Sequence, residues 1–454
     1  MSSKSKTVYV CDSCGNEHLK WQGQCPACGA WNSLSAVHLA KTAGNRRGSG
    51  GWVGTESGRR RLSELEQHAD PRLNTGIDEL DRVLGGGLVP GSVTLLGGDP
   101  GIGKSTLLLQ AGDSLSQRMP TLYVTGEESL QQVGLRAQRL GTVGDTLTLL
   151  AETSVEAVLD EARGAQCKIL IVDSIQTMHT DTVESSPGSA SQVRESAAEL
   201  LRFAKATATA VLLIGHVTKE GVIAGPRILE HMVDTVLYFE SDAGSRYRMV
   251  RAVKNRFGAV NEVGVFAMTE AGLKEVKNPS AIFLSRHPAP VAGSAVLVAR
   301  EGSRPMLIEV QALVDASQAA NPRRVAVGIE QQRLAMLLAL LHRHGGVATS
   351  GQDVFVNVVG GVHIDETAAD LPAVLAVVSS VSDRPLASGL VCFGELGLAG
   401  EIRAVPYGEE RLREAGKLGF TRAIVPMANE PRRAIEGLRV MAVERLADAL
   451  ACAF

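Results

Sequence analysis

The segment GDPGIGKS, which runs from Gly98 to Ser105, has the residue types and spacing of a loop that binds nucleotide phosphates. Its glycines let backbone N–H groups wrap around phosphate oxygens, and Lys104 supplies a positive charge for the β- and γ-phosphates of ATP. The hydroxyl of Ser105 is a candidate ligand of Mg²⁺. An apolar run precedes the segment and a helical pattern follows it, which is the context that such a loop requires. The predicted nucleotide-binding residues of this segment are Gly98, Asp99, Pro100, Gly101, Ile102, Gly103, Lys104, Ser105 and Thr106.

Polar side chains follow three other apolar runs of the sequence. Asp173 ends the run KILIV, where a carboxylate can bind the Mg²⁺ shell. Glu127 follows the run TLYVTG and is the candidate that orients and deprotonates the attacking water. Its neighbour Glu128 competes for that role, and either glutamate can instead be a charge at the start of a helix. His216 closes the run AVLLIG and is a candidate sensor of the γ-phosphate.

Four cysteines near the N-terminus form two C-x-x-C pairs, Cys11 with Cys14 and Cys25 with Cys28. Four thiolates bind Zn²⁺ tetrahedrally at about 2.3 Å, and such closed sites are structural because no position remains for water. A segment this small has little apolar core, so we expect zinc binding to supply its folding free energy. A redox pair and an iron–sulfur site are the competing interpretations.

These candidate residues require elements that position them, and the chain has room for two or three domains in its 454 residues. Residues 1–34 are predicted to be a zinc finger, and the Gly/Ser-rich residues 35–70, with several arginines, a flexible basic linker. In residues 71–275, buried strands alternate with helices, which predicts a doubly wound parallel sheet of the α/β class. Residues 276–454 begin with a hairpin pattern and continue with mixed elements, which predicts a separate α+β domain.

Composition narrows the class of protein further. The 46 basic and 49 acidic residues leave a formal charge of −3, which excludes a polybasic, histone-like protein and leaves only local basic patches. No run reaches the roughly 18 apolar residues of a membrane span, and the first residues lack the apolar core of a secretion signal. Clustered thiols fit a reducing compartment better than disulfides do. We therefore expect a soluble cytoplasmic protein without a membrane partner.

The motifs together resemble known proteins. The phosphate loop, with the upstream sequence LDRVLGGG at 80–87, resembles the RecA-like ATPase superfamily. The two C-x-x-C pairs and the sequence KNRFG at 254–258 make the chain similar to one family in it, the bacterial DNA repair ATPases. The similarity covers the whole chain except the linker. It implies a zinc finger, a RecA-like P-loop core and a C-terminal Lon-protease-like domain with the fold of ribosomal S5 domain 2.

The same resemblance implies an activity and partners. Lys104, Ser105, Asp173 and Glu127 would form an ATPase site, and the KNRFG cations Lys254 and Arg256 would act in a neighbour's site, as basic fingers do in hexameric helicases. It therefore implies a ring, most simply a hexamer, on single-stranded and branched DNA. Branch migration and heteroduplex extension with the RecA recombinase would follow. Without the resemblance, these two cations are typical of a solvated strand end.

Two loops are candidates for DNA contact by analogy with RecA-like proteins. Residues 178–194 are rich in Ser and Thr, which predicts a mobile loop, and residues 217–234 include Lys219 and Arg227. Neither loop contains Phe, Tyr or Trp, so we expect contacts with the DNA backbone rather than base recognition. Arg323 and Arg324 are further candidates in the C-terminal domain, although they can also be ordinary surface charges.

The Lon-like domain is predicted to lack proteolytic activity. Ala373 stands where the resemblance places the serine nucleophile, and Glu409 stands near the position of the lysine base. Without a hydroxyl and a base, acylation chemistry cannot proceed. An ATP-dependent protease is therefore disfavoured. A regulatory ATPase or kinase of the circadian-clock (KaiC-like) type and a non-enzymatic zinc-bearing scaffold also compete with the repair ATPase, and neither explains all the motifs.

Overall fold

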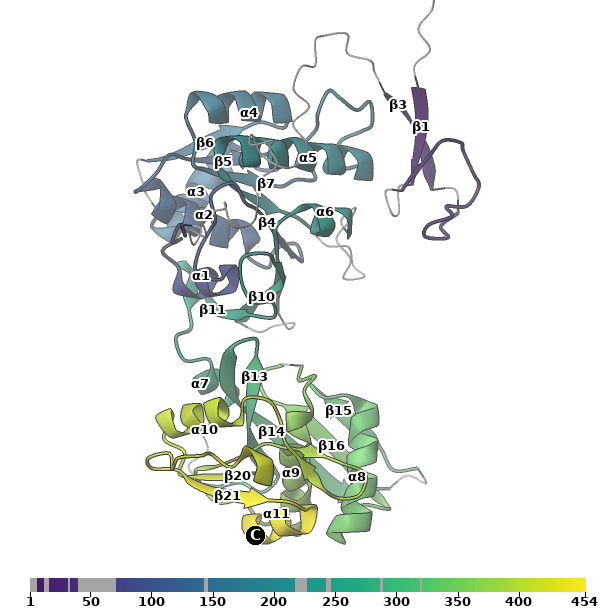
Figure 1. The fold of residues 1–454 in the computed structure, drawn as a ribbon, viewed down its shortest axis with the longest axis vertical. Coiled ribbons are helices and arrows are strands. Elements are labelled where there is room, and N and C mark those ends of the chain that lie inside the picture. The colour runs from purple at the N-terminus through teal and green to yellow at the C-terminus, as the bar shows by residue number, and fades with distance from the viewer. Residues whose placement is uncertain are drawn as a thin grey trace, which may run out of the picture. The chain divides into compact units, whose positions relative to one another are not determined.

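A computed structural model describes residues 6–11, 16–31, 33–39, 71–142, 146–216, 227–241, 246–285, 289–318, 321–361 and 363–454. The chain divides into two compact units, Met1–Val276 and Lys277–Phe454 (Figure 1). The predicted residues Cys14 and Lys219 lie outside the described residues, and of Arg227 only the backbone is described.

The core of the first unit is a nine-stranded sheet in the order β12-β11-β10-β9-β4-β8-β7-β5-β6. The strands are β4 (Val93–Gly98), β5 (Thr121–Thr125), β6 (Leu147–Ala151), β7 (Ile169–Asp173), β8 (Ala210–Ile214), β9 (Thr235–Glu240), β10 (Tyr247–Asn255), β11 (Val263–Thr269) and β12 (Gly272–Glu275). The six strands from β9 to β6 are parallel, and β10–β12 continue the sheet antiparallel. The four apolar runs of the sequence form β4, β5, β7 and β8, so the predicted doubly wound sheet is confirmed.

Helices cover both faces of this sheet, because its central strands are apolar on both sides. They are α1 (Asp78–Leu84), α2 (Lys104–Ser116), α3 (Leu130–Leu140), α4 (Val155–Gly164), α5 (Ala190–Thr207) and α6 (Arg227–Met232). Helices α1–α3 pack with one set of alternating strand residues and α4–α6 with the other. No helix in the described part of the chain has the length and hydropathy of a membrane span.

The segment between β7 and α5 corrects one prediction. The composition of residues 178–194 predicts a mobile loop, but α5 already begins at Ala190. The side chain of Gln192 is buried and donates to the carbonyl oxygens of Thr180, Val183 and Ser185 at 3.2, 2.8 and 2.9 Å. Composition indicates mobility because Ser and Thr are common in loops, whereas here one buried amide fixes the backbone.

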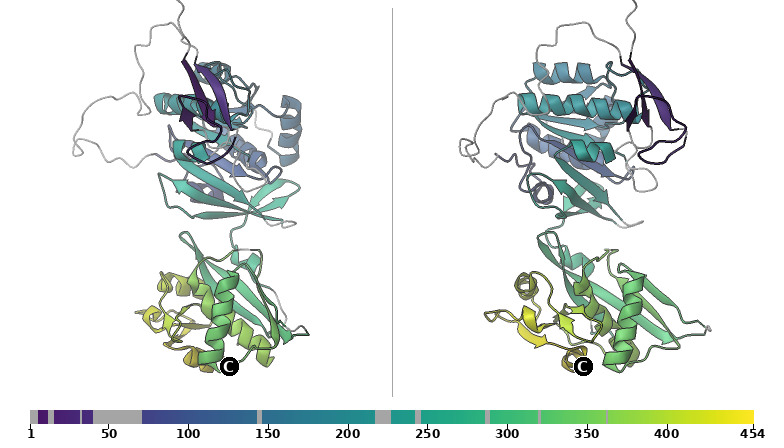
Figure 2. Two further views of the ribbon diagram at one scale, coloured as in Figure 1. Left: turned by 90° about the vertical axis from the view of Figure 1, so that its right-hand side faces the viewer. Right: turned by 45° about the vertical axis from the view of Figure 1, so that its right-hand side comes forward.

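The second unit is an α+β domain with a seven-stranded sheet in the order β15-β16-β14-β13-β17-β20-β21 (Figure 2). Its strands are β13 (Ser294–Glu301), β14 (Arg304–Ala316), β15 (Arg324–Val327), β16 (Gln352–Val358), β17 (Leu390–Cys392), β20 (Arg422–Pro426) and β21 (Arg439–Val443), and β18 (Glu395–Leu396) pairs with β19 (Ile402–Arg403). Its helices are α7 (Ser280–Phe283), α8 (Gln331–Gly345), α9 (Asp370–Ser382), α10 (Gly408–Lys417) and α11 (Leu446–Ala453). The predicted hairpin is β13–β14, in which Glu301 pairs with Arg304.

The N-terminal part of the first unit contains a small three-stranded sheet in the order β2-β1-β3. Strand β1 (Lys6–Cys11) pairs antiparallel with β2 (Glu17–His18) and with β3 (Leu34–Leu39). The core of this module consists of Cys11, Cys25 and Leu34, with Tyr9 packed against them. So small a core cannot stabilise a fold alone, which is consistent with a metal-dependent module.

Candidate nucleotide site and metal centre

The predicted phosphate loop joins the end of β4 at Gly98 to the start of α2 at Lys104. Gly98 has φ of +149°, and a Cβ there would lie 2.8 Å from the backbone oxygen of Phe239 on the neighbouring β9. Gly103 has φ of +120°, and its Cβ would meet the Cε of Met268 at 2.8 Å. Both positions therefore need glycine, and the loop backbone takes the left-handed turns that expose its N–H groups.

Lys104 is buried inside this loop. Its Nζ donates to the carbonyl oxygens of Gly98 at 2.7 Å and Asp99 at 2.8 Å. Burial lowers the pKa of Lys104, and the nearby carboxylates, Asp173 foremost, act in the opposite direction. The ammonium group is thus held within the loop and close to the carboxylates that follow β5 and end β7.

The carboxylate of Asp173 is held by a hydrogen bond from a buried tyrosine. Asp173 ends β7 and is paired with Thr125 of β5. The hydroxyl of Tyr123, on β5, donates to Asp173 Oδ2 at 2.6 Å. Burial and the charge of Asp173 raise the pKa of Tyr123 well above its ordinary value, so the phenol stays a donor. The sequence does not reveal this role, because a tyrosine in an apolar run is usually a core residue.

Glu127 lies at the centre of a polar cluster beside the phosphate loop. Its Oε1 accepts a hydrogen bond from Ser174 Oγ at 2.5 Å and lies 2.9 Å from His216 Nε2. The contact with His216, supported by Ser174, outweighs burial and holds the pKa of Glu127 below its ordinary value. Lys104 is close enough to act on the pKa of Glu127 in the same direction. The structure therefore brings Lys104, Asp173, Glu127 and His216 together.

Glu128 faces different partners. It forms an ion pair with Arg136 of α3, and its backbone N–H donates to Thr125 Oγ1 at 3.0 Å. The sequence favours Glu127 as the base, and the structure gives the two adjacent glutamates different partners. Glu128 secures α3 to the end of β5, whereas Glu127 remains with the loop residues.

The two KNRFG cations lie away from the phosphate loop of their own subunit. Lys254 Nζ donates to the carbonyl oxygens of Glu230 at 2.7 Å and Val233 at 2.8 Å, and so caps the end of α6. Arg256 pairs with the buried carboxylate of Asp234 at 3.1 Å. The same carboxylate accepts from the backbone N–H of Val93, the first residue of β4. The cations are therefore at the start of β4, and the phosphate loop is at its end.

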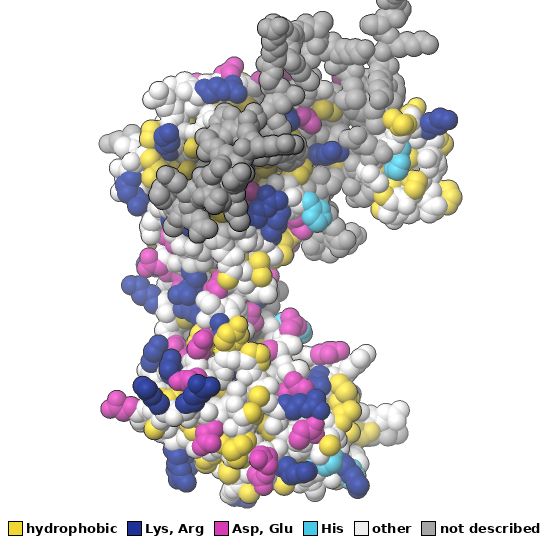
Figure 3. Space-filling view, in the orientation of Figure 1, with side chains coloured by type: hydrophobic (Ala, Val, Ile, Leu, Met, Phe, Trp, Pro, Cys, Tyr) yellow, Lys and Arg dark blue, Asp and Glu magenta, His cyan; other side chains and the backbone are white. Residues whose placement is uncertain are grey.

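Of the predicted DNA contacts, only Arg323 and Arg324 have described side chains. Arg324 donates to the carbonyl oxygens of Thr349, at 2.9 Å, and Gln352, so its guanidinium is engaged with the backbone. Arg323 is exposed and directly precedes β15. On the face that Figure 3 shows, basic and acidic side chains of the described residues are interspersed, which agrees with the nearly balanced charge. DNA contact by these residues stays a prediction.

Three of the four predicted zinc ligands converge in the N-terminal module. The sulfur atoms of Cys11, Cys25 and Cys28 all lie within 4.8 Å of one another. The Sγ atoms of Cys11 and Cys28 are 3.7 Å apart, which matches the roughly 3.8 Å expected for two ligands of one tetrahedral ion with bonds of about 2.3 Å. Cys14 lies outside the described residues, and His18 Nε2 is 3.6 Å from Cys25 Sγ. The donor set therefore fits a structural Zn²⁺.

Removal of the metal is expected to unfold this module. Structural zinc contributes about 10–16 kcal/mol of apparent binding free energy in small zinc fingers, so Cys25→Ser should lose zinc and ordered structure together. Metal content by mass spectrometry and tryptophan fluorescence check this, because two of the three tryptophans, Trp21 and Trp31, lie in the module. Cys452→Ser, on the exposed face of α11, is the matched control. Retention of one zinc per chain by Cys25→Ser would contradict the assignment.

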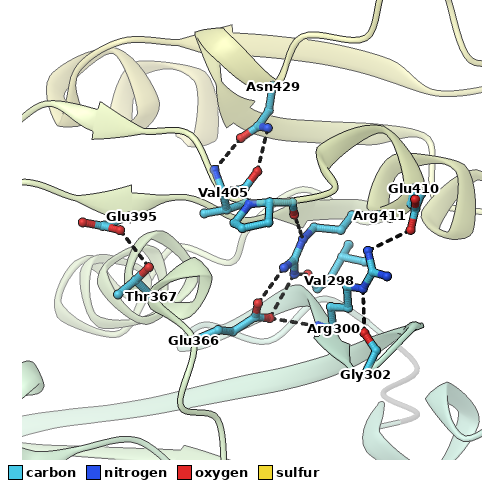
Figure 4. A network of polar contacts seen from close by, with 11 residues as sticks. Val298, Arg300, Gly302, Glu366, Thr367, Glu395, Val405, Glu410, Arg411 and Asn429 are labelled. Atoms are coloured by element: carbon cyan, nitrogen blue, oxygen red, sulfur yellow. Dashed lines mark hydrogen bonds and ion pairs between the residues drawn. The ribbon is translucent and has the colours of Figure 1, made fainter. Parts of the chain in front are cut away.

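The second unit has no serine–lysine pair at the predicted positions. Ala373 is buried within α9, and Glu409 pairs with Arg413 at 2.6 Å on the surface of α10. The residue of α10 that reaches the segment before α9 is Arg411, which pairs with Glu366 (Figure 4). A guanidinium and a carboxylate provide neither the hydroxyl nucleophile nor the neutral amine base of a serine–lysine pair.

Arg411 connects three elements from the interior of this unit. Its side chain is 1% exposed and donates to Glu366 Oε2 at 2.5 Å, to the Val298 carbonyl at 2.6 Å and to the Pro406 carbonyl at 3.0 Å. Glu366 also accepts from the backbone N–H of Arg300 at 2.9 Å. Such a buried pair is tolerated only when its remaining polar atoms are hydrogen-bonded, as they are here. Sequence reasoning missed it, because the two residues are far apart in the chain.

The phosphate loop after a central parallel strand, with Asp173 and Glu127 at the ends of neighbouring strands of the same sheet, defines the class of RecA-like P-loop ATPases. Curated relatives then place the chain more narrowly, because the match extends over its full length. The chain belongs to the RadA family of bacterial DNA repair proteins.

Three of these relatives are each called DNA repair protein RadA. The protein of Pseudomonas aeruginosa is 58% identical over 452 residues and covers 100% of both chains. That of Escherichia coli is 58% identical over 455 residues, with 99% of both chains covered. That of Bacillus subtilis is 46% identical over 451 residues, covering 99% of this chain and 98% of its own.

Family models and a solved structure match separate parts of the chain. A rubredoxin metal binding domain matches residues 9–36, an AAA domain residues 58–222, and subunit ChlI of Mg-chelatase residues 308–429. A solved structure described as an ATPase domain aligns with 47% of this chain and 94% of its own, at 13% identity and a TM-score of 0.41.

Proposed function

We propose that this protein is a DNA-dependent ATPase of DNA repair that works as a ring, most simply a hexamer. The observation that carries the proposal is the division of the catalytic groups between two ends of β4. Lys104, Asp173 and Glu127 gather at one end, while Lys254 and Arg256 lie at the other. A subunit thus holds a hydrolytic site at one end of β4 and a pair of cations at the other.

The chemistry at the first end is ATP hydrolysis. The loop backbone and Lys104 bind the phosphates, Ser105 and Asp173 would hold Mg²⁺, and the ion would supply charge neutralisation on the phosphoryl oxygens. Glu127 orients the attacking water and accepts its proton. A carboxylate with a lowered pKa is a weak base, and the pKa of Glu127 is lowered. The negative charge of a bound γ-phosphate would raise that pKa again. His216, in contact with Glu127, registers whether that phosphate is present.

The chemistry at the second end requires a neighbour. Asn255 of the KNRFG segment is level with Thr235, which is level with Thr94 at the start of β4. Four residues of strand separate Thr94 from Gly98, about 13 Å at 3.3 Å per residue. The cations therefore cannot complete their own subunit's site and would serve the adjacent one, where a guanidinium stabilises charge on the transferring phosphoryl group.

DNA would lie where β8 ends. Lys219 and Arg227 follow His216 in sequence, and the carboxyl ends of parallel strands meet at one edge of the sheet. A change at His216 on hydrolysis can thus be passed to residues that hold phosphates of single-stranded or branched DNA. Repeated around a ring, this would extend heteroduplex and migrate branches, in cooperation with the RecA recombinase. The thiolate ligands of the zinc module require a reducing compartment, which supports a location in the cytoplasm.

The test is ATP turnover with and without single-stranded DNA over a range of salt concentrations. We expect DNA to stimulate turnover, salt to weaken that stimulation, and Lys104→Ala to abolish turnover in every condition. Equal turnover with and without DNA, together with autophosphorylation, would instead identify a KaiC-like regulatory ATPase or kinase.

A further inference from the structure

The KNRFG segment is held by a residue that no motif includes. Arg72 Nη2 donates to the carbonyl oxygen of Phe257 at 2.5 Å, and its guanidinium lies 5.9 Å from the centre of the Phe257 ring. We propose that Arg72 is a positioning residue that sets where Lys254 and Arg256 stand toward the adjacent subunit. The inference rests on the proposed action of these cations between subunits.

The geometry of Arg72 shows that it is committed to this contact. Its Nη1 is buried and has no hydrogen-bond partner among the described residues. A buried donor without a partner costs about 1–3 kcal/mol. A side chain that served only solubility or general packing would turn this atom to solvent. The stacking on Phe257 and the bond to its carbonyl must therefore offset that cost.

The loop that Arg72 holds packs directly on the end of α1. A Cβ at Gly258 would lie 3.0 Å from the Cα of Gly85, so the two backbones touch. Asn255 Nδ2 donates to the carbonyl oxygen of Val83 at 3.3 Å, and Asn255 Oδ1 accepts from the N–H of Phe257 at 2.9 Å. The KNRFG loop thus packs in a defined position on the C-terminal end of α1, and Arg72 binds it at Phe257.

The KNRFG segment is also held at Asp234, by contacts that do not involve Arg72. The backbone N–H of Arg256 donates to the carbonyl oxygen of Asp234 at 3.1 Å, and the Asp234 side chain also pairs with Lys205 at 3.0 Å. Loss of Arg72 leaves these contacts in place. We therefore expect the domain to stay folded, while the segment after Arg256 loses its anchor at Phe257 and the guanidinium of Arg256 is less precisely placed.

The chain next to Arg72 is itself fixed to the ATPase core. Leu73 exchanges two backbone hydrogen bonds with Leu88, at 2.8 and 2.9 Å, and so fixes the chain next to Arg72. Arg72 therefore precedes a residue that is fixed to the core by its backbone.

The test compares three variants of the full-length protein. Arg72→Gln removes the cation, Arg72→Lys keeps a charged donor, and Arg118→Gln removes a different anchor of the same segment, because Arg118 Nη2 donates to the Asn74 carbonyl at 2.6 Å without touching the KNRFG segment. Misplaced catalytic groups cost up to about 100-fold. We expect Arg72→Gln to lower DNA-stimulated kcat about 10- to 100-fold with KM for ATP unchanged, Arg72→Lys to recover part of the loss, and Arg118→Gln to resemble wild type.

Mixed rings separate positioning from folding. Lys104→Ala subunits cannot hydrolyse ATP but carry intact cations, so adding them should raise the rate per Arg72→Gln subunit. Lys254→Ala mixed with Lys104→Ala calibrates the assay, and its failure to complement would overturn the proposed action between subunits. If that pair complements while Arg72→Gln has the wild-type rate or gains nothing from Lys104→Ala, the role of Arg72 is overturned.

Discussion

Replacement of Glu127 by glutamine is expected to lower the rate of ATP hydrolysis about 100- to 10,000-fold, the usual contribution of a positioned base. ATP binding should persist, because Lys104 and the loop backbone remain in place. Phosphate release in the steady state measures the first effect, and titration with a fluorescent ATP analogue measures the second. Since the pKa of Glu127 is lowered, the carboxylate is ionised near neutral pH, and its protonation should not limit the rate there.

The matched control is Glu128→Gln, which changes the adjacent residue in the same way. Its carboxylate pairs with Arg136 and not with the cluster at the loop. We expect turnover within about threefold of wild type, with a small loss of thermal stability at α3, since a partly exposed ion pair contributes up to about 1 kcal/mol. A large loss of turnover in Glu128→Gln, with Glu127→Gln active, would reverse the assignment of the base.

Replacement of Arg256 by alanine is expected to lower DNA-stimulated turnover about 1,000-fold or more, the range known for arginine fingers. Of the two cations, Arg256 is the better one to replace, because its loss should affect stability less. Its side chain is 54% exposed, and Asp234 keeps Lys205 and the Val93 N–H as partners when it is removed. Lys254 also caps α6, so Lys254→Ala combines a catalytic loss with a structural one.

Thermal unfolding distinguishes these contributions. Arg256→Ala should unfold at nearly the wild-type temperature and bind ATP normally. The control is Arg251→Ala on the same strand, where the arginine pairs with Glu240 at 3.3 Å, and it should keep turnover within about threefold. If Arg256→Ala lost stability in proportion to activity, or kept its turnover, the residue would be structural and not a finger.

Local patterns in the sequence predict most of the architecture. The phosphate loop is contiguous, and the apolar runs before Asp173 and His216 carry their own strand signal, so β7 and β8 lie where expected. The antiparallel edge formed by β10–β12 was not predicted, because the direction in which a strand pairs depends on its neighbours in the fold. The roles assigned to the site residues remain predictions, as does the ring.

The partners of several site residues are distant in the sequence, so the sequence alone does not reveal them. Glu127 and Glu128 are adjacent in sequence, and the structure gives them different partners: His216, 89 residues away, contacts Glu127, whereas Arg136 pairs with Glu128. Tyr123 under Asp173 and the Arg411–Glu366 pair were missed for the same reason, since each joins strands or helices that are adjacent only in the fold. Local composition carries no information about side-chain partners across a sheet.

The carboxylate of Asp234 has a consequence for genetics. It binds the first residue of the strand that leads to the phosphate loop, and it also binds Arg256. Any substitution at Asp234 is therefore expected to disturb both the subunit's own nucleotide site and the proposed contribution of Arg256 to its neighbour. Separation-of-function alleles must be sought on either side of it, at Glu127 for the first task and at Arg256 for the second.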